Sequence, residues 1–445
     1  MVDEQICIIG LGYVGLTLAV AMSDVGYKIV GVEKNGDVLN SLINKKAHFT
    51  EVGLNEKLAN VLERKMFSFS NNIADARNAR CFIITVGTPI LGNKKTDYKS
   101  IDSVCNSLKD LLKDGDIVIL RSTIQVGTTE DHVKPILDQS GKHYYLAFCP
   151  ERTLEGKALL ELSELPQIVG GIDEESTKKA VRIFRGLSRE IVTVPNIRSA
   201  EMVKLVNNTY RDYSFAFANE VARLTDELGI SATDVINAAN YHYPRCNLPV
   251  PGPVGGPCLE KDPYILESSV AHSGVHAELA MAARAVNERL ISWTVDSICR
   301  RFEVKASRSP KVFSLCGLAF KGQPETSDLR GSLIFNIIAY INEKFPSAEV
   351  RCWDPVVPVG EATKVLGNLK IANTFQDANS GADITIIQNN HIYFSNAHVE
   401  QEIAGMNQHG IVFDYWGKDY NRFDSLPNNI EYLILGSANV NRMKM

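Results

Sequence analysis

Short apolar runs separated by helical segments mark the first part of the chain. The first run, at 6–9, leads into a glycine-rich turn and an apolar segment that continues as a helix toward Ser23. Further apolar runs follow at 28–33, 80–86, 116–120, 144–148 and 191–194. Short strands that alternate with helices are typical of a doubly wound parallel sheet. The pattern therefore predicts an α/β domain over residues 1–198.

A long amphipathic helix is predicted next. Its apolar positions recur at helical spacing, at Met202, Val206, Tyr213, Phe217, Val221, Leu224 and Leu228. Ser199 is the expected N-cap, Glu201 lies in the first turn, and Gly229 is the expected end. About thirty residues at about 1.5 Å each give a rod of about 45 Å. Such a helix often separates domains and forms a dimer surface, so residues 199–302 are expected to be a helical dimerisation domain.

A second series of apolar runs lies in the last part of the chain, residues 303–445. The runs are at 311–316, 349–353, 383–388, 411–415 and 431–435. They predict a second parallel sheet, although the two sheet regions share no evident repeated sequence. The expected fold class is α/β, with two Rossmann-like doubly wound parallel-sheet domains joined by a long central helix and a small all-α region.

Composition excludes several classes of partner. The net charge is −5 and no lysine or arginine run stands out, so neither nucleic acid nor an anionic membrane is an expected partner. The uncharged run at 6–23 is too short and too rich in glycine to span a membrane, and no basic region precedes it, so no signal peptide is expected. Nine cysteines without a Cys-x-x-Cys motif favour a reducing cytoplasm, with no metal site.

The glycine-rich turn after the first strand has the full context of a dinucleotide-binding fingerprint. The expected cofactor-binding residues here are Gly10, Gly12, Tyr13, Val14 and Gly15. Glu33 ends the next strand, where a carboxylate binds ribose hydroxyls and repels a 2′-phosphate, so NAD is favoured over NADP. The neighbouring Lys34 weakens that preference, and a tight turn without a ligand is the alternative.

Thr88 lies in the segment that ends a later strand of the first sheet. The carboxyl ends of parallel strands face the same cofactor, so Thr88 is also expected to contact it. A turn without such a contact is the alternative.

The loop at 251–263 contains three glycines, four prolines and Cys258. A thiol on such a loop has little packing reason to exist, so we interpret Cys258 as a nucleophile. A thiolate adds to an aldehyde to give a thiohemiacetal, hydride transfer converts this to a thioester, and water cleaves the thioester. Together with a nicotinamide cofactor, this chemistry takes an alcohol to an acid and uses two NAD.

Several side chains could assist the thiol. Lys204 and Asn208 are four apart and share one face of the long helix, where a solvated surface is the alternative. Asp262 precedes a proline, so its carboxylate could cap a helix, act in catalysis, or do both. Glu151 and Glu155 follow a predicted strand, and exposed acids at a helix start are the alternative for them.

These motifs together resemble the nucleotide-sugar 6-dehydrogenases, a family that contains UDP-glucose, GDP-mannose and UDP-N-acetylhexosamine dehydrogenases. The resemblance covers nearly the whole chain. Its carriers are Gly-Leu-Gly-Tyr-Val-Gly (10–15), Arg-Ser-Thr-Ile-Gln-Val-Gly-Thr (121–128), Pro-Glu-Arg-Thr-Leu-Glu-Gly (150–156), Ala-Glu-Met-Val-Lys-Leu-Val-Asn-Asn-Thr-Tyr (200–210), Gly-Gly-Pro-Cys-Leu-Glu-Lys-Asp (255–262) and Gly-Leu-Ala-Phe-Lys (317–321), with Asp328 and Arg330 after the last.

The resemblance implies a catalytic role for six residues. Cys258 matches the nucleophile, and Lys204 and Asn208 match residues that stabilise charge on the substrate oxygen. Asp262 and Thr123 match residues that position water, and Glu155 matches a general base of the UDP-glucose enzymes. Thr123 is also an expected cofactor contact.

The resemblance further implies a UDP-sugar substrate and a homodimer or higher homo-oligomer. The expected substrate-binding residues are Glu151, Arg152, Lys204, Asn208, Arg245, Gly255 and Lys321, and Arg330 is expected to bind cofactor phosphate. Arg245 resembles an arginine that reaches the substrate across the dimer interface.

Two departures bear on the substrate. Pro257 precedes the nucleophile, where the family carries serine or histidine. Segments 150–152 and 243–247 resemble the N-acetylhexosamine enzymes, whereas Glu155 resembles the UDP-glucose enzymes. The interpretation favours a UDP-N-acetylhexosamine, with UDP-glucose as the alternative. A two-electron hydroxyacid dehydrogenase and a non-catalytic NAD-sensing protein are the competing classes.

Overall fold

The computed structural model describes residues 5–92, 94–396, 399–417, 426–427 and 429–437. It divides into two compact units, which we describe separately. Unit 1 holds the described residues up to Asn208 together with Lys261–Ala277, and unit 2 holds Thr209–Glu260 and the described residues from Glu278 onward.

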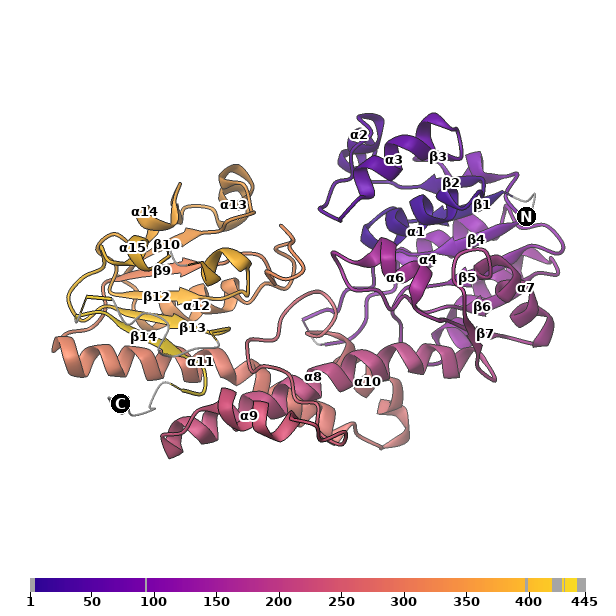
Figure 1. Cartoon of the computed structure of the whole chain (residues 1–445). Coiled ribbons are helices and arrows are strands. Elements are labelled where there is room, and N and C mark those ends of the chain that lie inside the picture. Colours follow the sequence, from indigo (N-terminus) through magenta and orange to yellow (C-terminus); the bar gives the residue numbers. More distant parts are fainter. Residues whose placement is uncertain (1–4, 93, 397–398, 418–425, 428, 438–445) are drawn as a thin grey trace. The chain divides into compact units, whose positions relative to one another are not determined.

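Unit 1 contains an eight-stranded sheet with the order β3-β2-β1-β4-β5-β6-β7-β8 (Figure 1). The strands are β1 (Ile6–Ile9), β2 (Ile29–Val32), β3 (Phe67–Ser70), β4 (Cys81–Ile84), β5 (Ile117–Leu120), β6 (Tyr145–Phe148), β7 (Gln167–Gly171) and β8 (Ile191–Thr193). All neighbouring strands are parallel except β6 and β7. The expected parallel sheet is thus confirmed, with β3 and β7 as additional strands and one antiparallel pair.

Alternate side chains of the central strands enter two different cores of unit 1. In β1, Ile6 and Ile8 join one buried apolar cluster, and Cys7 and Ile9 join another. This alternation follows from the two-residue period of a strand, and it means that both faces of the sheet are covered. The helices of unit 1 are α1 (Tyr13–Asp24), α2 (Gly36–Ile43), α3 (Leu54–Glu63), α4 (Lys99–Leu108), α5 (Lys134–Leu137), α6 (Ala158–Glu164), α7 (Glu174–Phe184) and α10 (Asp262–Val270).

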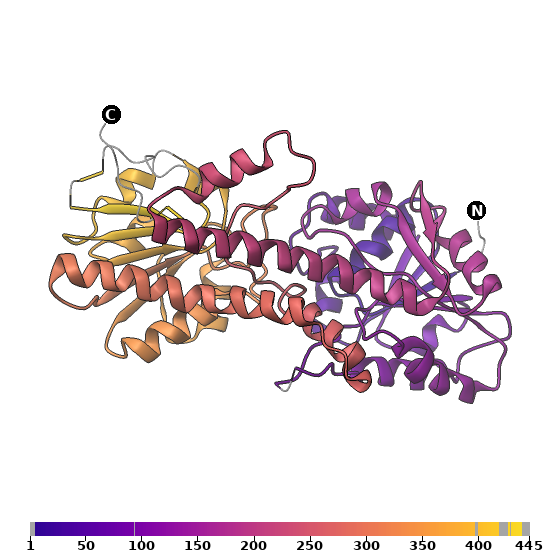
Figure 2. The same ribbon diagram turned by 90° about the horizontal axis from the view of Figure 1, so that it is seen from below.

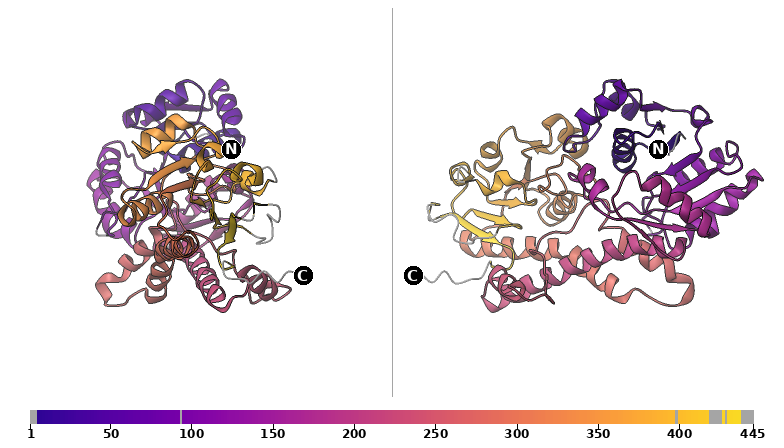
Figure 3. Two further views of the ribbon diagram at one scale, coloured as in Figure 1. Left: turned by 90° about the vertical axis from the view of Figure 1, so that its left-hand side faces the viewer. Right: turned by 45° about the vertical axis from the view of Figure 1, so that its right-hand side comes forward.

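Unit 2 contains a six-stranded, fully parallel sheet with the order β11-β10-β9-β12-β13-β14. The strands are β9 (Val312–Cys316), β10 (Glu349–Trp353), β11 (Lys370–Ile371), β12 (Ile384–Ile387), β13 (Ile411–Asp414) and β14 (Glu431–Ile434). The helices are α9 (Ala232–Asn240), α11 (Glu278–Ala306), α12 (Ile334–Lys344), α13 (Val359–Leu366), α14 (Phe375–Asn379) and α15 (Val399–Ile403). Helix α11 lies along one face of this sheet (Figure 3), and its Val295, Ile298 and Phe302 belong to the same buried cluster as strands β9 and β12. The second predicted sheet is therefore confirmed.

Helix α8 (Ile197–Leu228) begins in unit 1 and ends in unit 2. The predicted N-cap is wrong: the amide of Ser199 donates to the side chain of Asn196 at 2.8 Å, so Asn196 caps a helix that starts three residues earlier than predicted. Glu201 does not face solvent at the first turn. Its buried carboxylate accepts the amides of Gly127 and Thr129 at 2.5 and 3.0 Å, which fixes the turn after β5 against the helix.

Helix α8 shows the reverse of the usual burial pattern, in which apolar residues are buried and polar residues face solvent. Six apolar residues of the predicted stripe are exposed by 40 to 71%, namely Met202, Val206, Tyr213, Phe217, Leu224 and Leu228. Tyr210 adds to them. The polar residues Lys204 and Asn208, by contrast, are buried. Within the described residues, we find no helical segment with the length and hydrophobicity that a bilayer crossing requires.

Candidate active site

The turn between β1 and α1 fits a pyrophosphate group. Gly10 has a φ of +91°, and a side chain at Gly15 would lie 1.8 Å from the Gly10 carbonyl oxygen, so both glycines are needed for the turn and for close packing of helix on strand. A Cβ at Gly12 would meet no atom within 4 Å. That open space adjoins the first amides of α1, those of Tyr13 and Val14, where a helix N-terminus favours an anion.

A pocket of about 560 Å³ continues from this turn, which is within the usual range for a ligand site. It is lined by residues of the turn, by Glu33 and Lys34, by the segment Thr85–Gly87 and by polar residues of α4. The Glu33 carboxylate accepts the amides of Leu11 and Asn35 at 2.8 and 2.9 Å. These two bonds orient Glu33 at the pocket, so the residues fit the adenosine half of NAD.

Thr88 and Thr123 meet where β4 and β5 end. The buried Thr88 hydroxyl donates to the Thr123 carbonyl oxygen, and the Ser122 hydroxyl donates to the Val86 carbonyl oxygen at 2.6 Å. These bonds join two loops at the carboxyl edge of the sheet, the same edge as Gly10. The predicted cofactor contacts of unit 1 therefore lie along this one edge of the sheet.

Glu151 is a buried carboxylate held by Arg121. The two side chains make bonds of 2.7 and 3.0 Å, and the second Glu151 oxygen accepts the amides of Arg152 and Thr153. Burial raises the pKa of Glu151, but the Arg121 guanidinium, the Thr153 amide and the Lys204 ammonium outweigh it and hold the pKa below the ordinary value. The alternative of an exposed acid is therefore wrong for Glu151. Glu155, four residues on, is half-buried.

Lys204, Asn208 and Asp262 are all buried in unit 1, so the alternative of a solvated helix face is wrong. The Asn208 amide donates to Asp262 at 2.5 Å, and the Lys261 ammonium lies 2.7 Å from the other Asp262 oxygen. Asp262 is the first residue of α10 and does not cap it, because its carboxylate is turned toward these two partners. Within the described part of the chain, the Lys204 ammonium makes no hydrogen bond or salt bridge, although Glu151 is near enough to feel its charge.

Glu51 is a site residue that the sequence did not indicate. Its buried carboxylate accepts the Tyr13 hydroxyl and the amides of Gly156 and Ala158, the last two at 2.6 and 2.8 Å. Burial and Glu51 raise the pKa of Tyr13. The Tyr13 side chain therefore anchors the loop that carries Glu155, and only its backbone is left for the cofactor. A lone acid between two helices gave no sequence pattern that could reveal this.

The Cys258 loop lies in unit 2, and the thiol is exposed. The Gly256 amide donates to the Gly331 carbonyl oxygen at 2.7 Å, and a side chain at Gly255 would lie 2.5 Å from that oxygen. Gly256 has a φ of +93°. The glycines thus let the loop pack directly on the backbone next to Arg330, which is exposed and paired with Asp328.

The turn after β9 repeats the geometry of the turn after β1. Gly317 has a φ of +85°, and Asp354, which follows β10, accepts the amides of Leu318 and Ala319 at 2.5 and 3.1 Å. Asp354 was missed, although an acid just after the second strand of the sheet is the same pattern that identified Glu33. Lys321 follows this turn and stacks over Phe320 at 5.2 Å.

Arg245 follows α9 in unit 2 and is exposed. Its guanidinium stacks over Tyr243 at 4.5 Å and donates to the Tyr243 hydroxyl at 3.1 Å. Among the predicted site residues, Arg245, Gly255, Cys258, Lys321 and Arg330 belong to unit 2 and the others to unit 1.

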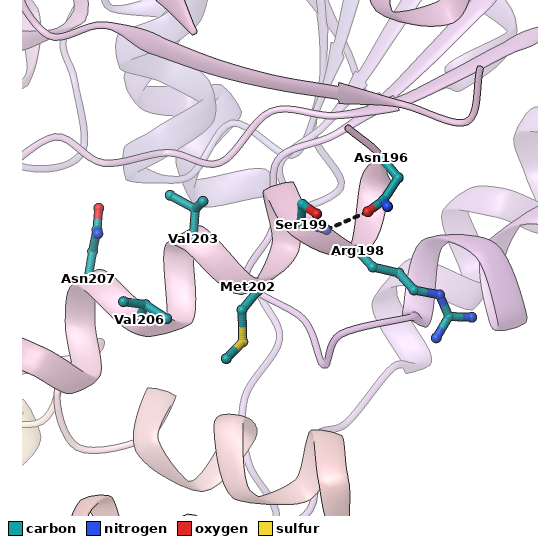
Figure 4. A pocket seen from close by; sticks show the side chains of 7 residues that line it. All are labelled: Asn196, Arg198, Ser199, Met202, Val203, Val206 and Asn207. Carbon is teal, nitrogen blue, oxygen red and sulfur yellow. Dashed lines mark hydrogen bonds between the residues drawn. The ribbon is translucent and has the colours of Figure 1, made fainter. Parts of the chain in front are cut away.

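A second hollow, of about 520 Å³, lies on the exposed face of α8 (Figure 4). Its lining is mostly uncharged: Asn196, Arg198, Ser199, Met202, Val203, Val206 and Asn207. Arg198 is occupied by Glu130 and Asp131 at 2.6 and 2.8 Å.

Comparison with known proteins gives matches in the same order along the chain. The NAD binding domain of the UDP-glucose/GDP-mannose dehydrogenase family matches residues 4–188, the central domain 198–289 and the UDP binding domain 314–418. A UDP-N-acetyl-D-mannosamine dehydrogenase from Methanococcus maripaludis is 34% identical over 418 residues, which cover 92% of each chain.

Solved structures agree with the observed fold. A UDP-D-ManNAc dehydrogenase from Pyrococcus horikoshii has a TM-score of 0.87 and 29% identity, with 98% of this chain and 100% of that chain covered. A UDP-N-acetyl-mannosamine dehydrogenase from Staphylococcus aureus has a TM-score of 0.82 and 30% identity, with 98% and 99% covered. From its fingerprint, its two parallel sheets and these matches, this chain belongs to the UDP-glucose/GDP-mannose dehydrogenase family and is an NAD-dependent oxidoreductase.

Proposed function

We propose that this enzyme oxidises the C6 hydroxyl of a UDP-N-acetylhexosamine to a carboxylate, using two NAD per sugar and Cys258 as nucleophile. The observation that carries the proposal is an exposed thiol on a tightly packed glycine loop in an NAD-dependent dehydrogenase. The named substrate of the relatives, UDP-N-acetyl-D-mannosamine, supports the amino sugar. Glu155 favours UDP-glucose as the second candidate.

The chain's own residues supply nucleophile, charge stabilisation and base. When bound, NAD would supply the hydride acceptor for both oxidations of C6. After the first oxidation, the Cys258 thiolate adds to the aldehyde carbon, and the oxygen that gains charge is stabilised by Lys204 and Asn208. The second oxidation leaves a thioester. Water positioned by Asp262 and Thr123 then attacks it, Glu155 takes the proton, and the thiolate leaves.

The environment of Lys204 supports this role. Lys204 as a whole residue is only 8% exposed, yet its ammonium has no hydrogen-bonding partner among the described residues, which leaves its donors for a ligand. The buried negative charge of Glu151 offsets the cost of burying this cation. A preoriented buried cation stabilises a developing oxyanion far better than a solvated one does.

We assign binding of the UDP-sugar to Lys321, Arg245 and Gly255 of unit 2 and to Glu151 and Arg152 of unit 1, with Arg330 at cofactor phosphate. The UDP binding domain match at 314–418 supports the assignment to the C-terminal part. We propose the corresponding division into an NAD domain (1–198), a helical dimerisation domain (199–302) and a UDP-sugar domain (303–445). A free catalytic thiol agrees with a cytoplasmic location.

The test is the stoichiometry of NADH. The purified enzyme should form two NADH per UDP-N-acetylmannosamine or UDP-N-acetylglucosamine, and should turn over UDP-glucose at least about tenfold more slowly, since the site would be built around an acetamido group. Cys258→Ala should not complete turnover, whereas Cys246→Ala, a half-buried thiol that precedes the loop, should. One NADH with a released aldehyde from the native enzyme would refute the thioester route.

We further propose a homodimer formed through the exposed face of α8. The exposed apolar residues from Met202 to Leu228 are three, four or seven positions apart along one side of a long helix, which is the pattern of a helix–helix seam. The hollow of Figure 4 lies on this same face. A second copy of the chain would cover both, because a two-fold interface pairs a surface with itself.

A further inference from the structure

Four buried polar side chains join helices α8 and α11 inside unit 2, where the two helices lie side by side (Figure 2). We name them the α8–α11 polar cluster: Asp212, Asn219, Arg284 and Asn287. Arg284 pairs with Asp212 at 2.6 Å, and the Asn287 amide donates to Asp212 at 2.9 Å. The Asn219 amide donates to the Asn287 side-chain oxygen at 2.9 Å. Burying polar groups costs free energy unless they are hydrogen-bonded, so a role is expected for this cluster.

The cluster contacts the Cys258 loop on both sides of the nucleophile. Before Cys258, Asn219 accepts the Gly252 amide at 2.8 Å and donates to the Gly252 carbonyl oxygen at 3.0 Å. After Cys258, Arg284 donates to the Leu259 carbonyl oxygen at 3.3 Å. Between these points, the Gly256 amide is held by Gly331. The loop is thereby fixed at three points around one exposed thiol.

The composition of the loop makes these bonds decisive. Pro251, Pro253 and Pro257 have no N–H to donate, so no regular secondary structure can order the loop. Gly252 also packs closely, since a Cβ there would lie 2.6 Å from Trp416. The side-chain amide of Asn219 pairs with both the N–H and the C=O of Gly252. These bonds replace the backbone hydrogen bonds that a helix or a sheet would provide.

We infer that Asn219 and Arg284 are positioning residues for the Cys258 thiol. They act on the loop backbone and not on the substrate. The inference rests on the proposed function, because it gives the clamped thiol its role as nucleophile. A displacement of about 1 Å at a reacting group can cost about a hundredfold in rate, so loosening the loop should slow chemistry more than it weakens substrate binding.

The test compares Asn219→Ala with Asn379→Ala. Asn379 is an equally buried asparagine of unit 2, bonded to Phe375 and Thr385 and remote in contacts from the loop, so it controls for loss of stability. Asn219→Ala should lower kcat about tenfold or more, with KM for the UDP-sugar changed less than about threefold. Amide exchange in the 252–259 segment should accelerate. Asn379→Ala should leave both kcat and exchange of that segment unchanged.

A second pair of variants controls for loss of folding. Arg284→Lys keeps a cation beside Asp212, but the lysine ammonium ends one bond short of the Nη1 atom that donates to both Asp212 and Leu259. Arg308→Lys alters the Arg308–Asp383 pair elsewhere in unit 2. Only the first should lower kcat and speed exchange. Native-like kcat in folded Asn219→Ala and Arg284→Lys, or equal losses in the control variants, would overturn the inference. Failure of the native enzyme to form two NADH would instead refute the proposed function, and the exchange measurement would still report on the clamp.

Discussion

Glu33 and Asp354 occupy the same position in the two units. Each follows the second strand of its sheet, and each accepts the amide of the leucine that follows a glycine with positive φ, Leu11 at 2.8 Å and Leu318 at 2.5 Å. A carboxylate here shapes the ligand-binding turn in addition to presenting charge. The pair therefore offers a matched set of substitutions, one for each proposed nucleotide site.

Glu33→Gln should raise KM for NAD about tenfold with little change in KM for the UDP-sugar. An amide has one acceptor oxygen, so either Leu11 or Asn35 loses its partner, which costs about 1–3 kcal/mol. Asp354→Asn should do the reverse and raise KM for the UDP-sugar. Steady-state kinetics with each substrate varied in turn measures both. Equal effects of both variants on both constants would contradict the assignment of Glu33 to the NAD site and of Asp354 to the UDP-sugar site.

The Glu151–Arg121 pair should make stability depend on pH. The folded pKa of Glu151 lies below its ordinary value of 4.5. The stabilising contribution of the charged form is thus fully present above about pH 4.5, and it is lost as pH falls through the folded value. At pH 7, Glu151→Gln should lower the free energy of unfolding by about 3 kcal/mol, because a buried guanidinium loses its counter-charge.

Urea unfolding across the acid range measures this dependence. The difference between native protein and Glu151→Gln should shrink as pH is lowered below about 4.5. The exposed Glu164→Gln is the control and should follow the native profile. A difference that stays constant down to acid pH would show that the pair does not titrate as described.

At the scale of elements, the pattern of apolar residues predicted the strands that are buried on both faces of a sheet. The apolar runs at β1, β4 and β5 became buried strands, as did those at β9 and β12. Strand β3, with the sequence Phe-Ser-Phe-Ser, and the two-residue β11 were not predicted, because neither contains a continuous apolar run. Caps were wrong where a competing side chain lay nearby: Asn196 displaced Ser199, and Asp262 turned toward Asn208.

The exposed face of α8 gives a prediction for assembly. Phe217→Asp should convert the dimer to a monomer, since burying a carboxylate in an apolar seam costs several kcal/mol. Val304→Asp is the matched control: Val304 is also an exposed apolar residue of a long helix, α11, but lies outside the stripe. Sedimentation velocity distinguishes the two states. A dimeric Phe217→Asp variant would place the interface elsewhere.

At the scale of the whole molecule, sequence motifs identified the chemistry, and contacts across long sequence separations supplied the support. Cys258 was predicted from its loop alone. Asn219 and Glu51 were not, because they act on backbone 33 and 105 positions away, and no local pattern encodes such pairings. The missed residues are therefore those that bond to distant backbone, and the predicted ones are those to which we propose catalytic roles.

NAD and UDP should each stabilise chiefly one of the two units. Each unit has its own apolar cores, and among the residues that the structure describes no buried cluster contains residues of both. A ligand at a hundredfold excess over its Kd stabilises what it binds by about 2.7 kcal/mol. NAD should therefore slow amide exchange chiefly in β1, β4 and β5, and UDP alone chiefly in β9 and β12.

Hydrogen exchange followed by mass spectrometry, with each ligand separately and with both, reads this out by segment. Because α8 runs through both units, its amides should be protected by either ligand, and by both together to the sum of the two effects. Protection of all strands to the same extent by NAD alone would mean that the chain unfolds as one cooperative structure, and the separate cores would then not be independent.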